Sequence, residues 1–391
     1  MNKLILNTGI QEFIENNIGT DIMSVLLSKP YFEGISNKEL VEQIESAKKA
    51  KYKLPTWYHT QGILYPKKLH IEQTSSELTA AYKSNLTTAN RIADLSGGLG
   101  VDTFYFAKKA ISVDHFEINP ELAEIVQHNF SVLNANNINC YNEDGIATVL
   151  NSNQLYDMIY IDPDRRDHQK NRVFFLSDCK PDVPMHLEML FDKAPLIMLK
   201  TAPLLDISQG IKDLSGVKEI IALAVKNELK ELLWILEKNF DQTPTVKAVN
   251  LESPHLDFNS LIDSEEKTNI TPTPIGSYLY EPNVALLKIG MFKTIAKHFK
   301  LGKLHSNTHL YTSDELIEFP GRIFKINEVL FYNKKNLKPF ENTKANISCR
   351  NFKISVEQLK KKHRIKDGGA QYLFFTTDFN NQAVVLVCQK D

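Results

Sequence analysis

Residues 91–103 read RIADLSGGLGVDT, and this stretch decides the fold class. An apolar run ends at Asp94, glycines follow at positions 97, 98 and 100, and a helical pattern begins near Asp102. Glycines in such a turn let the chain bend tightly and let a ligand approach the backbone without meeting a side chain. The pattern indicates a strand, a turn and a helix, although a plain strand-to-helix turn would also use glycine.

The next two predicted strands favour a ligand-binding turn. The second strand ends at Phe116 and Glu117, so a carboxylate follows Asp94 by 23 residues. An acid at that position in an α/β sheet holds the hydroxyl groups of a ribose. The third strand leads to Glu143 and Asp144, where a carboxylate can accept a hydrogen bond from an adenine amino group.

Short apolar runs alternate with helical stretches from residue 91 onwards, as in a parallel sheet with crossover helices. The predicted strands cover residues 91–95, 111–116, 137–140, 157–161, 195–199, 218–224 and 246–251. These seven strands predict an α/β, doubly wound, Rossmann-like core. Residues 227–238, NELKELLWILEK, have the spacing of an amphipathic helix.

The segments on either side predict further domains. Residues 1–72 show helical spacing and predict a helical N-terminal domain before a core domain over residues 73–255. Proline and glycine recur over residues 253–276, which therefore predict a linker. Two small α/β modules are expected beyond it, at residues 277–326 and 327–391. Their expected strands cover residues 277–281, 322–325, 328–332, 345–352, 371–377 and 383–389, and their expected helices cover residues 283–300 and 355–363.

The composition excludes several classes of protein. Of the 391 residues, 42% are hydrophobic and 24% are charged, as in an ordinary globular protein. No apolar run approaches the roughly 18 residues of a membrane helix, and no signal-peptide pattern opens the sequence. The four cysteines form no CxxC pair, so we expect them to be small core residues in a reducing compartment. The chain is expected to be cytoplasmic. No metal site is expected.

The net charge of −1 conceals a basic C-terminal region. Residues 290–391 hold 18 Lys and Arg against 9 Asp and Glu, which leaves a net charge of −10 for residues 1–289. A basic run, KKKHR at residues 360–364, lies near the aromatic residues Phe352, Tyr372, Phe374 and Phe375. Basic and aromatic side chains together favour RNA as a partner, although a solvated basic face has the same composition.

The charges around the glycine turn favour one cofactor over another. A dinucleotide site places a pyrophosphate at the N-terminus of the helix, where Asp94 and Asp102 would repel it. The same two carboxylates could receive the ammonium and sulfonium charges of S-adenosylmethionine. This cofactor is therefore expected at the turn.

A second motif, DPDRR at residues 162–166, follows the fourth strand at the edge where doubly wound sheets bind ligands. Asp162 can accept a hydrogen bond from an exocyclic amine or a ring N–H of a methyl acceptor, and it is our first catalytic candidate, with Asp164 beside it. Arg165 and Arg166 could bind a nucleotide phosphate or stack on a base. A surface turn with ordinary ion pairs is the alternative.

Neighbouring residues narrow the chemistry. Enzymes that methylate exocyclic amines usually place an aromatic residue where Arg165 stands. Methylation at pyrimidine carbon 5 needs a cysteine nucleophile, and the KTAP sequence at residues 200–203 has none. Cys179 is a remote alternative as a nucleophile, and a buried or incidental thiol is the favoured interpretation. Lys200 could face the acceptor, but a lysine at a strand end is more often solvated. Direct transfer to a ring nitrogen or an exocyclic group is expected.

These motifs resemble class I S-adenosylmethionine-dependent methyltransferases over about residues 74–252. The resemblance implies that the cofactor is bound by Asp94, Ser96, Gly97, Gly98, Gly100, Glu117, Ile118 and Asp144. Ser96 stands where the commonest version of the first motif has glycine, a replacement also common among nucleic-acid methyltransferases.

Four segments resemble a narrower, bacterial group of these enzymes that ends in a THUMP-like domain: QTSSELTAAYK at 73–83, FEINPEL at 116–122, YIDPDRR at 160–166 and ANISCRNFKIS at 345–355. The resemblance implies that residues 327–391 are the THUMP-like domain and that the module before it is ferredoxin-like. YLYEP at 278–282 also resembles the group, but the sequence assigns no physical role to Glu281.

The expected function is methyl transfer from S-adenosylmethionine to a base nitrogen of rRNA or tRNA. Two alternatives remain open. The chain could be an RNA-binding protein that keeps a methyltransferase fold with little catalysis, or it could methylate DNA or a small molecule and carry an incidental basic tail.

Overall fold

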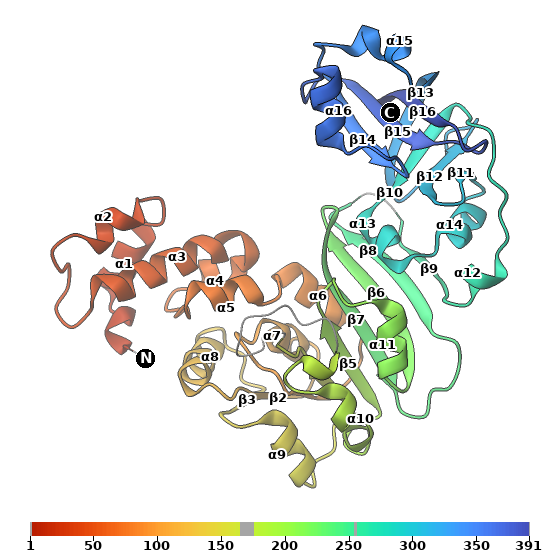
Figure 1. Ribbon diagram of the computed structural model, residues 1–391. Helices are drawn as coiled ribbons and strands as arrows, with labels where there is room; N and C mark the ends of the chain where they lie inside the picture. Colours follow the sequence, from red (N-terminus) through yellow and green to blue (C-terminus); the bar gives the residue numbers. More distant parts are fainter. Residues whose placement is uncertain (1, 165–175, 254–255, 391) are drawn as a thin grey trace. The chain divides into compact units, whose positions relative to one another are not determined.

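The computed structural model describes residues 2–164, 176–253 and 256–390 (Figure 1). The chain forms two compact units, one of Met1–Val217 with Trp234–Phe240 and one of Lys218–Leu233 with Asp241–Asp391. The described strands form two sheets, one of nine strands and one of seven. Within the described ranges, no helix has both the length and the apolar character needed to cross a membrane.

Helices make up the N-terminal segment. They are η1 (Lys3–Leu6), α1 (Thr8–Asn16), α2 (Ile22–Leu26), α3 (Asn37–Lys53), α4 (Pro55–His59) and α5 (Lys68–Gln73). The longest of them, α3, begins with a capping box between Ser36 and Glu39, which satisfies backbone N–H groups at the helix start. Their apolar side chains share one core with α7 (Val101–Ala107) and α8 (Pro120–Val132), where the rings of Trp57 and Phe104 lie 4.9 Å apart.

The larger sheet has the strand order β3-β2-β1-β4-β5-β7-β6-β8-β9. Its strands are β1 (Arg91–Asp94), β2 (Ser112–Phe116), β3 (Ile138–Tyr141), β4 (Met158–Ile161), β5 (Leu196–Thr201), β6 (Val217–Val225), β7 (Glu228–Glu237), β8 (Thr245–Leu251) and β9 (Phe258–Leu261). β1 pairs in parallel with β2 and β4, β2 with β3, and β4 with β5. The helices between them are α7, α8, α9 (Gly145–Asn151), η2 (Leu176–Asp178), α10 (Val183–Phe191) and α11 (Ile207–Asp213), and α6 (Glu77–Asn85) precedes β1. The chain is an α/β protein with a mixed sheet.

The helix predicted over residues 227–238 is wrong, because this segment is strand β7. Leu232, Leu233 and Trp234 are consecutive and fully buried, so both faces of the strand are covered. A strand buried on both faces has a continuous apolar run, and such a run can imitate helical spacing. Lys226 and Asn227, both with positive φ, form the two-residue turn that joins β7 to β6.

The prediction of seven strands is also too low, since nine strands form the sheet. β6 pairs in parallel with β8, and β9 pairs antiparallel with β8. Residues 253–276, expected to be a linker, contain β9 and α12 (Ser264–Lys267). The short β9 escaped prediction because its sequence, FNSL, has too few apolar residues to show a strand period.

The C-terminal sheet has the order β11-β12-β10-β13-β16-β15-β14. Its strands are β10 (Tyr278–Pro282), β11 (Gly302–His305), β12 (Thr308–Ser313), β13 (Gly321–Phe331), β14 (Asn346–Arg350), β15 (Gln371–Thr377) and β16 (Ala383–Lys390). Its helices are α13 (Val284–Ile289), α14 (Phe292–His298), α15 (Lys334–Leu337), η3 (Lys338–Phe340) and α16 (Val356–His363). Leu359 of α16 packs against Leu373 and Phe375 on one face of the sheet.

Several expectations for this region need correction. The helix predicted over residues 283–300 is two helices, because Gly290 adopts a left-handed φ of 72° after α13. Residues 322–325 and 328–332 lie largely in one strand, β13, whose pairing with β16 shifts register between Ile326 and Glu328. β11 and β12 were not predicted. The domain boundaries read from the sequence stay predictions.

Candidate functional site

Four acidic residues lie where neighbouring parallel strands end. Asp94 ends β1, Glu117 follows β2, Asp144 follows β3 at the start of α9, and Asp162 follows β4. In the sheet β1 lies between β2 and β4, and β3 lies beside β2. Because the carboxyl ends of parallel strands meet at one edge, the structure brings these four predicted site residues to the same rim.

The glycine turn and the second acid are in direct contact. The backbone N–H of Gly98 donates to Glu117 Oε2 at 2.8 Å, and that of Asn119 donates to Oε1 at 2.7 Å. Gly98 has φ of 58°, a left-handed conformation that favours glycine. Burial raises the pKa of Glu117, while these two hydrogen bonds lower it. The predicted ribose acid therefore lies against the predicted turn.

Gly97 shows why the turn needs a residue without a side chain. A Cβ at this position would lie 2.5 Å from the carbonyl oxygen of Phe116 and 2.8 Å from the ring of His115. We expect Gly97→Ala to lower the free energy of unfolding by about 1–3 kcal/mol, because the loop cannot accept the extra atom without moving. Urea denaturation measures this change.

A matched control exists in the N-terminal helices. Gly9 lies in α1 with no atom within 4 Å of an added Cβ, so Gly9→Ala is expected to leave stability unchanged or slightly raised. If Gly97→Ala and Gly9→Ala unfold at the same urea concentration, the close approach at Gly97 does not constrain the loop.

Asp94 is buried among hydrogen-bond donors. Thr103 Oγ1 donates to its Oδ2 at 2.6 Å, and Ser96 donates to its Oδ1 through the backbone N–H at 3.1 Å and the hydroxyl at 3.2 Å. Burial raises the pKa of Asp94 to about 7 against the effect of these bonds. His115 lies beside the same threonine, and burial lowers its pKa to about 3, so its ring is neutral.

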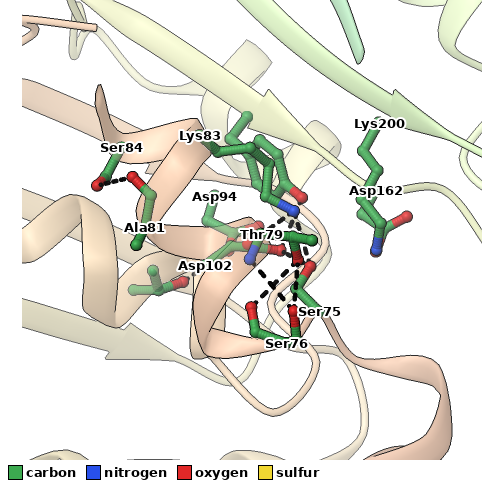
Figure 2. Close-up of polar contacts among 12 residues, drawn as sticks. Ser75, Ser76, Thr79, Ala81, Lys83, Ser84, Asp94, Asp102, Asp162 and Lys200 are labelled. Atoms are coloured by element: carbon green, nitrogen blue, oxygen red, sulfur yellow. Dashed lines mark hydrogen bonds and ion pairs between the residues drawn. The ribbon is translucent and has the colours of Figure 1, made fainter. Parts of the chain in front are cut away.

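Asp102 belongs to a buried ion pair that the sequence did not reveal. Lys83 Nζ lies 2.9 Å from Asp102 Oδ1 and donates to Ser75 Oγ at 2.7 Å, and the Lys83 side chain is 0% exposed (Figure 2). Ser75 and Tyr160 donate to Asp102 Oδ2 at 2.7 and 2.8 Å. Burial alone would raise the pKa of Asp102, but the charges of Lys83 and Lys200 hold it below its usual value.

This pair changes the expected electrostatics of the turn. Asp102 was expected to receive a positive charge of the cofactor, but Lys83 already supplies one. The two remaining carboxylates at the turn are Asp94 and Glu117. Lys83 and Ser75 both belong to the QTSSELTAAYK segment, and only its likeness to a known group singled that segment out.

Asp162 is tied to the glycine turn and to the next strand. Its backbone N–H donates to Ser96 Oγ at 2.7 Å, and its Oδ2 forms an ion pair with Lys200 at the end of β5. The Lys200 side chain is 11% exposed, so the expectation of a solvated lysine is wrong. Ser96 thus connects the candidate cofactor loop to the candidate acceptor loop, which explains a serine at the position usually held by glycine.

The rest of the DPDRR motif is described only in part. Asp164 is exposed, and its backbone pairs with that of Lys180 in an isolated bridge. Arg165 and Arg166 lie outside the described residues. Cys179 is buried, which agrees with the reading of an incidental thiol.

The residues expected near adenine are exposed. Ile118 is 71% exposed, so its side chain is accessible to a ligand. Asp144 is exposed and caps α9 by accepting the N–H of Ala147 at 3.0 Å. Sequence reasoning missed Gly145, where a Cβ would lie 2.8 Å from the backbone of Leu95. Asp144, the acid predicted to lie near adenine, is thereby held close to the glycine turn.

The donor set fits a nucleoside that carries a positive charge. Carboxylates and an exposed apolar side chain line the rim, and the described residues of the chain hold no group of His, Cys, Asp and Glu with metal-binding geometry. A purine can lie against Ile118, a ribose can be held by Glu117, and a cation can be held by Asp94.

Comparison with known proteins identifies the domains and the family. A ferredoxin-like domain family matches residues 278–320, and a THUMP domain-like family matches residues 321–390. None of the curated proteins matches the sequence. A crystal structure from Porphyromonas gingivalis W83, described as a "putative methyltransferase", is 31% identical, with a TM-score of 0.86; the match covers 99% of this chain and 98% of that one.

Two further structures are more distant. A "putative RNA methyltransferase" from Pyrococcus horikoshii is 16% identical with a TM-score of 0.33 and covers 48% of this chain and 98% of its own. A tRNA methyltransferase from M. jannaschii is 14% identical with a TM-score of 0.30 and covers 42% of this chain and 50% of its own. Nothing about this chain follows from likenesses this weak.

The fold, shared over nearly the whole chain with the Porphyromonas gingivalis structure, places the protein in a methyltransferase family. The chain belongs to the family of that Porphyromonas gingivalis protein, and its own C-terminal residues form a THUMP-like domain.

Proposed function

We propose that this protein transfers a methyl group from S-adenosylmethionine to a base nitrogen of RNA. One observation carries the proposal: the glycine turn after β1 contacts the carboxylate after β2 directly, through Gly98 N–H and Glu117 Oε2 at 2.8 Å. In this proposal the glycine turn, the carboxylate of Glu117 that it hydrogen-bonds and the exposed Ile118 form a nucleoside site at the edge of the sheet.

Three carboxylates would hold the cofactor in this proposal. Asp94 would bind its ammonium group, Glu117 its ribose, and Asp144 its adenine amino group, while Ile118 would cover one face of the purine. When bound, S-adenosylmethionine supplies an electrophilic methyl group on a sulfonium centre. The chain's task is to align the acceptor with that group, because alignment contributes much of the rate of a displacement.

The position of Asp162 suits the acceptor. Lys200 binds Asp162 Oδ2 and holds the carboxylate in one orientation, so Oδ1 is the oxygen that can accept a hydrogen bond from a base. The backbone N–H of Asp162 donates a hydrogen bond to Ser96 Oγ in the glycine turn, and this contact brings the acceptor loop next to the cofactor loop. An acceptor N–H bonded to Asp162 would direct its nitrogen lone pair towards the methyl group.

The pH dependence of cofactor binding tests the role of Asp94. Its pKa is about 7 because it is buried, so only a minor fraction is ionised at pH 6. A cation binds the ionised form, and affinity for S-adenosylmethionine should therefore rise several-fold between about pH 6 and about pH 7.5. Calorimetry at several pH values measures this. An Asp94→Asn variant should bind weakly and without that slope; an equal slope in the variant would assign the pH effect to another group.

The C-terminal region supports RNA as the substrate class. It carries a THUMP domain-like match and 18 basic against 9 acidic residues over 290–391. The expected aromatic contribution is smaller than the sequence suggested, because Phe374 and Phe375 are both buried in the sheet. Lys361 of α16 is exposed, whereas Lys360 pairs with Asp367.

Transfer of tritium from labelled S-adenosylmethionine to bulk RNA tests the proposed function. We expect incorporation with the wild-type chain and none without it, and nucleoside mass spectrometry identifies the modified base. Cofactor binding without transfer to RNA would favour a binding protein with a methyltransferase fold. Transfer to DNA or small molecules alone would overturn the RNA assignment, and binding of a dinucleotide in place of S-adenosylmethionine would overturn the cofactor.

A further inference from the structure

The C-terminal sheet curls so that its edge strand β14 approaches strands β10 and β12. Strands β10 and β14 are separated by β13, β16 and β15 in the sheet order. In a flat sheet, strands four positions apart lie about 19 Å from each other. Ser348 Oγ of β14 nevertheless lies 3.4 Å from Glu281 Oε1 of β10, and Asn351 Nδ2 donates to Thr308 Oγ1 of β12 at 3.1 Å. The sheet therefore closes on itself around Leu279, Phe324 and Phe374.

Charged groups gather where the sheet closes. Glu281 is 3% exposed and accepts hydrogen bonds from Arg322 Nε at 2.6 Å and from Arg350 Nη2 at 2.8 Å. We call Glu281, Arg322, Ser348 and Arg350 the polar seam. Residues Glu281 and Arg322 are register partners on adjacent strands, and Arg350 comes from the far edge of the sheet. The seam is the physical role of Glu281 that the sequence alone did not show.

The polar seam has more positive charge than its own carboxylate neutralises. Two guanidinium groups share one buried carboxylate, which leaves a net charge of +1. The side chains of Arg322 and Arg350 are 45% and 38% exposed, although their partner is buried. In a buried structural ion pair both partners are ordinarily buried, whereas here the buried Glu281 holds two guanidinium groups whose side chains stay partly exposed. Such fixed guanidinium groups match a phosphate, which accepts paired N–H bonds.

An aromatic pair beside the polar seam favours a nucleic acid over an isolated anion. The half-buried ring of Tyr372 lies 4.9 Å from the ring of Phe324, over which the Arg322 guanidinium lies at 5.4 Å. An aromatic ring next to an anchored cation can stack on a base whose phosphate the cation binds.

We infer that the polar seam binds a backbone phosphate of single-stranded RNA, with Arg322 and Arg350 as the contacting residues and Glu281 as the residue that positions them. The inference rests on the proposed function for its choice of RNA. It adds a binding site in the C-terminal sheet, separate from the residues at the rim of the larger sheet.

Anisotropy of a labelled single-stranded RNA oligonucleotide, measured at several salt concentrations, tests the inference. Arg350→Gln leaves Glu281 paired with Arg322, so the fold is expected to persist. Its affinity should fall about tenfold, and the slope of log affinity against log salt should decrease by about one, the contribution of one phosphate contact. Lys335→Gln removes an equal charge from an exposed site in α15 and should change affinity by less than about twofold.

A second variant separates the polar seam from net charge and from folding. The double variant Glu281→Gln/Arg350→Gln removes one charge of each sign, so the net charge of the chain is unchanged. The inference predicts that RNA affinity still falls about tenfold while thermal unfolding shows a folded chain. Wild-type affinity in this double variant would mean that the seam only closes the sheet, and the inference would be overturned.

The outcomes also separate this inference from the proposed function. RNA binding that depends on Arg350, without methyl transfer, supports the inference and rejects the proposed function. Methyl transfer to RNA, with RNA affinity unchanged in both seam variants, supports the proposed function and rejects the inference. The inference is overturned if the chain does not bind RNA. It is also overturned if a glutamate-rich peptide binds in place of RNA and its binding depends on Arg350.

Discussion

Asp162→Ala is expected to reduce the rate of methyl transfer at least about a hundredfold, because the acceptor then loses the group that orients its nitrogen. The backbone bond from Asp162 to Ser96 survives the substitution, since it uses the main-chain N–H. Affinity for S-adenosylmethionine should therefore change by less than about threefold, because only the acceptor contact is removed. Single-turnover transfer of tritium to RNA measures the rate, and calorimetry measures the affinity.

Asp192→Ala is the matched control for this prediction. Asp192 also pairs with a lysine, Lys238, but its side chain is 74% exposed and it lies after α10, away from the strand ends that form the rim. Its transfer rate should equal that of the wild type. A rate for Asp162→Ala within threefold of wild type would remove Asp162 from the mechanism and leave Lys200 as the charged group to test at the acceptor loop.

Lys83→Met is expected to lower the free energy of unfolding by about 3–5 kcal/mol, because it leaves the buried carboxylate of Asp102 without its cation. Lys83 is 0% exposed, and its ammonium lies 2.9 Å from Asp102 Oδ1. Ser75 and Tyr160 still donate to Asp102 in the variant, but neutral hydroxyls do not balance the charge. Urea denaturation followed by circular dichroism measures the loss.

A double variant distinguishes lost charge balance from lost packing. Lys83→Met/Asp102→Asn removes both charges and keeps an acceptor for Ser75 and Tyr160, so it should recover most of the stability lost in the single variant. Lys238→Met, which breaks an exposed pair, should leave the urea midpoint close to wild type. If the double variant is as unstable as Lys83→Met, packing of the lysine stem and not charge balance explains the loss.

The rim of acids could be predicted because its residues stand beside strand ends in the sequence. Asp94, Glu117, Asp144 and Asp162 each follow a short apolar run, and parallel strands bring such ends together by topology alone. Their roles in binding belong to the proposed function. Lys83 and Lys200 were missed or misread because a lysine shows its partner only when distant segments are packed together.

Strand β7 is the opposite case, because the local sequence pattern wrongly predicted a helix there. NELKELLWILEK satisfies a helical period, and nothing within twelve residues says that both faces will be covered. Trp234 donates from Nε1 to Thr201 Oγ1 of β5, and its ring fills the space beside Gly210 of α11. These contacts come from residues far along the chain, so propensity and spacing could not decide between helix and strand.

The sequence by itself determined the α/β class, the glycine turn and the order of acids along the rim, because each depends on neighbours a few residues apart. Only the tertiary structure decided which charged side chains are neutralised by buried partners and which stay accessible to a ligand. Asp102 lies in α7 and Glu281 in β10, yet Asp102 is neutralised by a buried lysine, whereas Glu281 pairs with two arginines that stay partly exposed. Burial and pairing are properties of packed segments, and for that reason the chain must fold before its charges acquire their roles.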